Sequence, residues 1–105
     1  MPTAAPSLEA FEANAAEVGA VMRALANERR LMILCRLVER REASVNTLAA
    51  EIGLGQSATS QHLAKMREEG IVAYRRDGQT LWYRIADPRI ARILKLLHDL
   101  YCRGD

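Results

Sequence analysis

Two adjoining stretches decide the fold of this chain: Gln56-Ser-Ala-Thr-Ser-Gln-His-Leu-Ala-Lys-Met-Arg-Glu-Glu-Gly70 and Ile71-Val-Ala-Tyr-Arg-Arg-Asp-Gly-Gln-Thr-Leu-Trp-Tyr-Arg-Ile85. The first predicts a helix over about residues 57–69, with hydroxyl and amide side chains at its start and a glycine at its end. The second predicts a β-hairpin, because apolar and polar residues alternate around the turn signal Asp77-Gly78. A helix with a polar start beside a hairpin with arginines near its tip is the layout of a winged helix-turn-helix that binds DNA.

Further helices are predicted on both sides of this unit. Apolar residues recur at helical spacing over about residues 8–25, 28–41, 45–52 and 88–101. Asn27 is the expected N-cap of the second helix, and Ser44 or Asn46 that of the third. Residues 1–7 are expected to form a flexible tail and residues 8–105 one domain. The predicted fold is therefore mainly helical with a small β-hairpin.

Two of these helices carry apolar patterns that predict packing. In the second helix, an inward stripe is expected at i, i+3, i+4 and i+7, formed by Leu31, Leu34, Cys35 and Val38. In the last helix, the apolar set spans too wide an arc for one packed face. A surplus apolar face on a terminal helix favours a partner, most simply a second copy of the chain.

Composition bounds the function class. The chain has 105 residues, half of them hydrophobic, and a net charge of only +2, although 13 of its 15 basic residues are arginine. No apolar run approaches the ~20 residues that a membrane span needs, and no signal peptide is recognisable, so a cytoplasmic protein without membrane contact is expected. There is no Cys-x-x-Cys pair and no glycine-rich phosphate loop, so an enzyme is not expected.

Ten polar residues are the candidates for contacts with double-stranded DNA. Glutamine can read adenine, hydroxyl and imidazole groups can contact base edges or phosphates, and the N–H groups at a helix start can hold a phosphate. The helix supplies Gln56, Ser57, Thr59, Ser60, Gln61, His62 and Lys65, and the hairpin supplies Arg75, Arg76 and Gln79. Two other interpretations stay open: a helical hairpin with a solvated polar face, and a dimerisation module that antagonises another DNA-binding protein.

Three motifs resemble the ArsR family of winged-helix repressors. They are Ala24-Leu-Ala-Asn-Glu-Arg-Arg-Leu-Met-Ile-Leu34, Leu54-Gly-Gln-Ser-Ala-Thr-Ser-Gln-His-Leu63 and the segment 78–85, within a match of roughly residues 18–103. The resemblance implies a homodimer joined through the first and last helices. It also implies binding to an operator inverted repeat and release of that DNA when an inducer is sensed.

The metal motifs of that family are not matched. The thiolate motif of its arsenic, cadmium and lead sensors would need cysteines where this chain has Ser44 and Asn46. The zinc motif of its last helix is matched at Asp87, but its other ligand positions fall on Arg89, Leu100 and Arg103. Arginine cannot ligate zinc. No metal or other cofactor is therefore expected at either family site.

The two cysteines resemble those of the dithiol branch of the family, which senses persulfides or redox change. Cys35 lies in Leu31-Met-Ile-Leu-Cys35, and Cys102 ends His98-Asp-Leu-Tyr-Cys102. The resemblance implies that organic persulfides join the two thiols by a sulfur bridge, lower DNA affinity and derepress sulfur-detoxification genes. Three alternatives remain: a general peroxide or disulfide switch, a metal site formed by Cys35, His98 and Cys102, and two inert core thiols.

Overall fold

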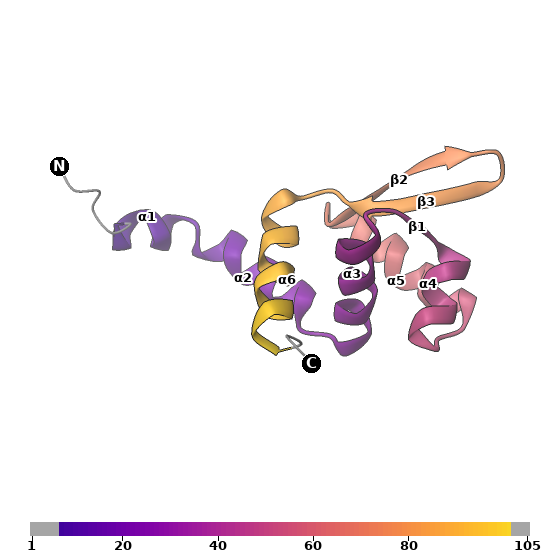
Figure 1. Ribbon diagram of the computed structural model, residues 1–105. Helices are drawn as coiled ribbons and strands as arrows, with labels where there is room; N and C mark the ends of the chain where they lie inside the picture. Colours follow the sequence, from indigo (N-terminus) through magenta and orange to yellow (C-terminus); the bar gives the residue numbers. More distant parts are fainter. Residues whose placement is uncertain (1–6, 102–105) are drawn as a thin grey trace.

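The computed structural model describes residues 7–101, in which six helices and three strands follow one another (Figure 1). Their bounds are α1 Leu8–Ala13, α2 Ala15–Leu25, α3 Glu28–Arg40, β1 Ala43–Ser44, α4 Val45–Ile52, α5 Gln56–Glu68, β2 Val72–Asp77, β3 Thr80–Ile85 and α6 Pro88–Tyr101. The fold is mainly helical with a small antiparallel sheet, and the predicted winged helix-turn-helix is confirmed. Of the expected flexible tail, residues 1–6 lie outside the described range.

The starts of two central helices follow from their capping residues. The side-chain oxygen of Asn27 accepts a hydrogen bond from the backbone N–H of Arg30 at 3.1 Å. Ser44 Oγ accepts one from the N–H of Thr47 at 3.2 Å, so Ser44 is the cap of α4. Each bond satisfies an N–H group that has no partner within the helix. Gly53 ends α4 in the left-handed conformation, at φ 69°.

The prediction of a single N-terminal helix over residues 8–25 is wrong, because the helix is interrupted at Asn14. Its backbone has φ −105° and ψ 7°, and its N–H turns back to the carbonyl of Phe11. The Asn14 side chain also donates to the carbonyl of Ala10 at 3.0 Å. Asparagine competes in this way for the backbone acceptors that a continuing helix would use. The result is a short α1 followed by a separate α2.

The predicted hairpin is joined by a third strand that the sequence did not reveal. The sheet order is β1-β3-β2, with both pairs antiparallel, and Ala43 of β1 pairs with Tyr83 of β3. Between β2 and β3 the loop has two residues, of which the first is Gly78 at φ 64°. A glycine with positive φ in that position is typical of the type II′ turn, whose twist suits a hairpin. The turn therefore begins one residue later than Asp77-Gly78 suggested.

The hydrophobic core lies where α3 meets the sheet, α5 and α6. In α3 the fully buried residues are Ile33, Leu34 and Leu37. The stripe predicted for this helix was therefore partly wrong, since Leu31, Cys35 and Val38 are only half-buried. The other buried apolar residues of this core are Leu25, Ala43, Leu48, Leu63, Met66, Ile71, Val72, Tyr83, Ile90 and Leu94. The helix-turn-helix and the sheet thus share one core with α6.

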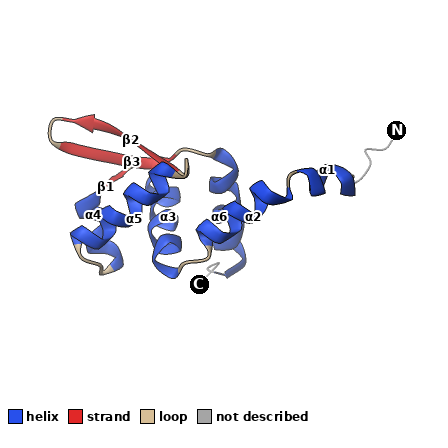
Figure 2. Ribbon diagram, turned by 180° about the vertical axis from the view of Figure 1, so that it is seen from behind, coloured by secondary structure: helices blue, strands red, loops and turns tan. Residues whose placement is uncertain are grey.

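Two elements, the β2–β3 hairpin and α1, project from opposite sides of the molecule (Figure 1). The β2–β3 hairpin extends beyond the helices on one side, and α1 extends away from the body on the other; Figure 2 shows the same arrangement from behind. No residue of α1 is buried. Large apolar side chains are exposed on α1, α2 and α6, namely Leu8, Phe11, Val18, Met22, Leu96, Leu100 and Tyr101. No helix within residues 7–101 is both long and apolar enough to cross a membrane.

Candidate DNA interface and thiol site

The helix α5 presents one polar face to solvent and buries the other. Leu63 and Met66 are fully buried, which fixes the helix against the core. On the outer face the polar residues are exposed, and a shallow hollow of about 420 Å³ is lined by Gln56, Ser57, Ser60, Gln61 and Ala64. Lys65 is exposed farther along α5, and His62 is half-buried. Six of the seven predicted contact residues of the helix therefore reach the surface.

Thr59 is the exception and corrects the sequence-based assignment. Its side chain is fully buried, and its hydroxyl donates to the backbone carbonyl of Gly55 at 2.9 Å. A buried hydroxyl that is already bonded within the helix does not reach a DNA groove. Thr59 therefore has a structural role: it ties the first turn of α5.

The start of α5 is open to solvent. Gly55 is its N-cap and supplies no side chain to bond the first N–H groups. The backbone N–H of Thr59 makes the first intrahelical bond, to the Gly55 carbonyl at 3.0 Å. The N–H groups before it lack helical partners, and the helix dipole adds partial positive charge there. This end of the helix suits an anionic group such as a phosphate.

A cation–π contact joins the hairpin to α5, and an aromatic pair packs the two strands of the hairpin together. The rings of Tyr74 and Tyr83 meet edge to face with centroids 5.3 Å apart. The Arg67 guanidinium of α5 lies 4.6 Å from the centroid of the Tyr74 ring. Tyr83 is buried, and that burial raises the pKa of its hydroxyl. The wing is thus held in a defined position beside the polar helix.

The predicted wing residues differ in their surroundings. Arg76 and Gln79 are exposed near the tip of the hairpin. Arg75, by contrast, forms an ion pair with Glu42. Its Nε donates to Glu42 Oε2 at 2.8 Å, and its Nη2 donates to Glu42 Oε1 at 3.0 Å. Glu42 was not identified from the sequence, because no local pattern signals a contact between residues 33 positions apart.

A carboxylate also joins the helix-turn-helix to α3. Glu51 of α4 pairs with Arg40 through two hydrogen bonds, one of them 3.0 Å long, and its nearest approach to Arg36 is 3.9 Å. These arginines lower the pKa of the Glu51 carboxyl, chiefly through the Arg40 hydrogen bond. The helix that carries Cys35 is thereby tied to the first helix of the DNA-reading unit.

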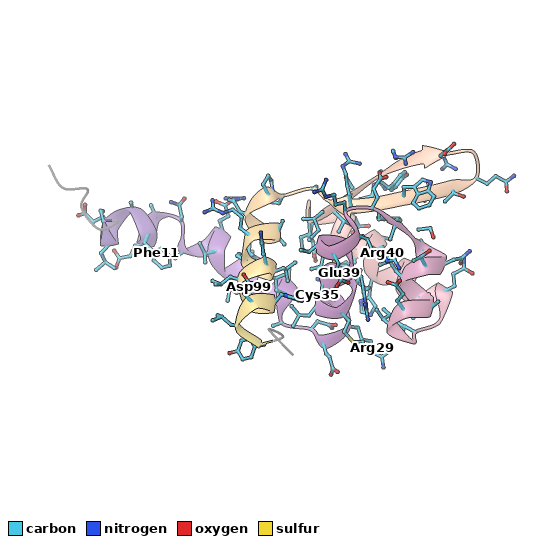
Figure 3. The ribbon with its side chains drawn as sticks, in the orientation of Figure 1. Phe11, Arg29, Cys35, Glu39, Arg40 and Asp99 are labelled. Carbon is cyan, nitrogen blue, oxygen red and sulfur yellow. The ribbon has the colours of Figure 1, made fainter. Side chains whose placement is uncertain are left out.

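Cys35 lies half-buried on the side of α3 that faces α6. Figure 3 shows it opposite Asp99, in the space between the two helices. Two hollows border it, one of about 580 Å³ that also touches Met32 and Arg36, and one of about 360 Å³ that touches Lys95 and Asp99. His98 lines both. Cys35 therefore borders two hollows that are large enough for a small molecule.

The second predicted thiol, Cys102, lies outside the described residues. In the sequence it directly follows Tyr101, the last residue of α6. His98, the third member of the alternative metal set, is exposed on α6. Within residues 7–101, no group of three or more His, Cys, Asp or Glu side chains is arranged to hold a metal ion.

Comparison with known proteins identifies the family. Residues 27–74 match the family model described as bacterial regulatory protein, arsR family. The transcriptional activator HlyU of Vibrio cholerae serotype O1 is 41% identical over 99 residues, which cover 94% of this chain and 91% of HlyU. The chain belongs to the ArsR family.

Solved structures of other ArsR-family regulators have the same fold. The repressor BigR from Xylella fastidiosa superposes with a TM-score of 0.86 at 36% identity, covering 94% of this chain and all of the BigR chain. The antimony-specific repressor AntR superposes with a TM-score of 0.80 at 33% identity, covering 95% and 94% of the two chains. This ArsR-family chain is therefore a transcriptional regulator, and the names of its relatives point away from an enzyme.

Proposed function

We propose that this ArsR-family regulator is a homodimeric repressor whose reduced form binds an operator inverted repeat, and that organic persulfides release it by cross-linking Cys35 and Cys102. Each sulfur added to a thiol comes from one persulfide, which leaves as a thiol. When both thiols have become persulfides, attack of one on the other expels hydrogen sulfide and leaves a bridge with one added sulfur, so the organic persulfide is itself the oxidant. The consequence is lower DNA affinity and derepression of sulfur-detoxification genes.

Contact with DNA is supported by the shape and polarity of α5 and the wing. The exposed face of α5 offers amide, hydroxyl and ammonium groups in the arrangement that a major groove accepts. Arg76 and Gln79 extend from the wing toward the neighbouring backbone or minor groove. We assign the specific contacts to α5 and the sequence-independent contacts to the wing.

Dimerisation is supported by the apolar side chains left exposed on α1, α2 and α6. A groove of about 470 Å³ between α1, α2 and α6 is lined mainly by apolar residues, among them Phe11, Val18, Met22 and Ile93. An exposed apolar surface of this kind marks an interface. A second copy brings two recognition helices to successive major grooves, which explains recognition of an inverted repeat.

The position of Cys35 is the observation that carries the sensing proposal. Cys35 is half-buried, is bordered by two hollows and faces α6. Cys102 is the next residue in the sequence after the end of α6. The thiolate is the reactive form of a cysteine, and Arg36 and Lys95 line these hollows together with Glu39 and Asp99. A link between α3 and the segment after α6 would couple the helix-turn-helix core to the dimer interface.

Intact-mass spectrometry tests the sensing chemistry. The reduced protein is treated in parallel with glutathione persulfide and with hydrogen peroxide. A bridge that carries added sulfur and joins Cys35 to Cys102 after persulfide treatment alone supports the proposal. A plain disulfide formed by peroxide indicates a general redox switch instead, and no cross-link with either reagent contradicts sensing by these thiols.

A metal-responsive repressor is the second candidate, because the chain resembles a repressor described as antimony-specific. Its ligands here would be Cys35, His98 and Cys102, a soft set suited to a thiophilic metal. Native mass spectrometry of the reduced protein with Sb(III), Cu(I) or Zn(II) tests it. One metal per protomer, lost in His98→Ala, would favour this candidate over persulfide sensing.

A further inference from the structure

We propose that Glu42 competes inside the molecule for the arginine with which the wing binds a DNA phosphate, and so limits the affinity of the wing for DNA. The proposal rests on the proposed DNA-binding function. It assigns a role to an acidic residue that lies in neither the recognition helix nor the hairpin. Its basis is the geometry around Arg75.

The carboxylate of Glu42 and the guanidinium of Arg75 form a two-pronged pair. The Nε and Nη2 donors of Arg75 meet the two carboxylate oxygens of Glu42 at 2.8 and 3.0 Å. A phosphate uses a pair of oxygens in the same way, and arginine binds both groups bidentately. Glu42 therefore occupies the donors that a phosphate would need.

This pair is open to solvent and thus exchangeable. The side chains of Arg75 and Glu42 are 53% and 32% exposed. Exposed ion pairs contribute little to folding, so exchange of one anion for another leaves the fold intact. The Arg75 hydrogen bond lowers the pKa of the Glu42 carboxyl, so Glu42 is ionised at neutral pH.

Trp82 keeps Arg75 in place if the carboxylate is displaced. Arg75 and Trp82 are direct cross-strand partners in the β2–β3 ladder. The guanidinium carbon lies 5.8 Å from the centroid of the Trp82 ring, within the range of a cation–π contact. That contact uses none of the N–H donors of Arg75. The arginine thus stays on the wing while its donors pass from Glu42 to a phosphate.

The charges around Arg75 indicate whether removal of the Glu42 carboxylate should strengthen or weaken DNA binding. Arg75, Arg76 and Arg84 make the hairpin basic, whereas Asp77 and Glu42 oppose them. A phosphate that binds Arg75 must displace Glu42 and approaches its negative charge. Removing that charge should strengthen DNA binding without regard to base sequence, since phosphates carry no sequence information.

Salt-dependent binding of Glu42→Gln tests the proposal. Fluorescence anisotropy is measured on two labelled duplexes, one selected from a random library by the reduced wild-type protein and one of scrambled sequence. We expect Glu42→Gln to bind both duplexes about 3- to 10-fold more tightly at low salt. The slope of log K against log salt should steepen by up to about 0.9 per dimer half-site, the value for one phosphate contact, because Glu42 no longer offsets the charge that Arg75 brings to the phosphate.

Two further variants test whether the effect of Glu42 depends on Arg75. Glu39→Gln removes the same charge from an exposed position of α3, where Glu39 lies 3.6 Å from Arg36, and should change affinity by less than about twofold with an unchanged slope. In an Arg75→Gln background, Glu42→Gln should have no larger effect than Glu39→Gln.

The opposite results overturn the proposal. If Glu42→Gln weakens binding or leaves the salt slope unchanged, Glu42 orients Arg75 as a structural tie and is no competitor. If the effect persists in the Arg75→Gln background, it does not pass through Arg75. A wild-type protein that fails to select any duplex would instead refute the proposed function, an outcome distinct from both.

Discussion

At the scale of single residues, Thr59 and Ser60 show how burial separates two adjacent hydroxyls. Both lie in the first turns of α5 and both fit a sequence-based contact list. Only the structure shows that Thr59 is buried and bonded to Gly55 whereas Ser60 is exposed. Helical periodicity places the two on different faces, but a polar residue on the inner face gives no local signal that it is buried.

We predict that Thr59→Val lowers the free energy of unfolding by about 1 kcal/mol, because a buried hydrogen bond is lost. Its affinity for selected DNA should stay near that of the wild type. Ser60→Ala is the matched control and should do the reverse: stability within about 0.5 kcal/mol of wild type and weaker DNA binding. Urea unfolding measures stability, and fluorescence anisotropy measures DNA affinity. A large loss of affinity in folded Thr59→Val would mean that Thr59 does contact DNA.

Arg41 is strained at the end of α3. It has φ 71° and ψ −44°, a conformation that costs a residue with a Cβ atom of order 1–3 kcal/mol. We predict that Arg41→Gly raises the free energy of unfolding by about 1 kcal/mol, net of the entropy that glycine loses on folding. Arg41→Ala keeps the Cβ atom and should give no such gain in urea unfolding. Equal stability of the two variants would mean that the Cβ atom does not strain the backbone at this position.

At the scale of elements, the sequence predicted what local chemistry determines. The caps Asn27 and Ser44 and the alternation of the hairpin are local features, and each was confirmed. The third strand was not predictable, because two residues form a strand only when β3 lies beside them. The pairs Arg75–Glu42 and Arg40–Glu51 were missed for the same reason.

The start of α6 gives a prediction about pH. The Asp87 side chain accepts hydrogen bonds from the side chain and backbone N–H of Arg89, which lower the pKa of its carboxyl. Because the folded pKa lies below the unfolded value of about 3.9, this stabilisation is present above that pH and is lost as the pH falls through the folded pKa.

Asp87→Asn keeps a capping side chain and removes only the charge, so it isolates this effect. We predict that the wild type is more stable than Asp87→Asn near neutral pH, and that the difference shrinks progressively below about pH 4. Urea unfolding at several pH values between 3 and 7 measures it. A difference that grows as the pH falls would contradict the assignment.

At the scale of the whole molecule, α1 projects from the body of the protein and has no buried residue (Figure 1). Phe11 is 56% exposed far from the core (Figure 3). Such an arm gains apolar burial only against a partner. It therefore links the exposed apolar surface to the proposed dimer and, through the dimer, to recognition of an inverted repeat.

We predict that Phe11→Glu weakens dimerisation at least 10-fold and leaves the fold of the protomer unchanged, because Phe11 is 56% exposed and lies outside the core. Ala13→Glu adds the same charge to the far side of α1 and should remain dimeric. Sedimentation velocity over a concentration series measures association, and circular dichroism checks the fold. If Phe11→Glu dimerises as strongly as the wild type, α1 is not part of the dimer interface.

Release of DNA by persulfide is tested by measuring the DNA affinity of one protein sample in three states: reduced, treated with glutathione persulfide, and reduced again. We predict that DNA affinity is about 5- to 150-fold weaker after persulfide treatment, the range of typical allosteric coupling, and recovers fully on reduction. Cys35→Ser and Cys102→Ser should bind like the reduced wild type in all three states. Unchanged wild-type affinity after persulfide treatment, or loss of DNA binding in a folded serine variant, would show that Cys35 and Cys102 do not sense persulfides.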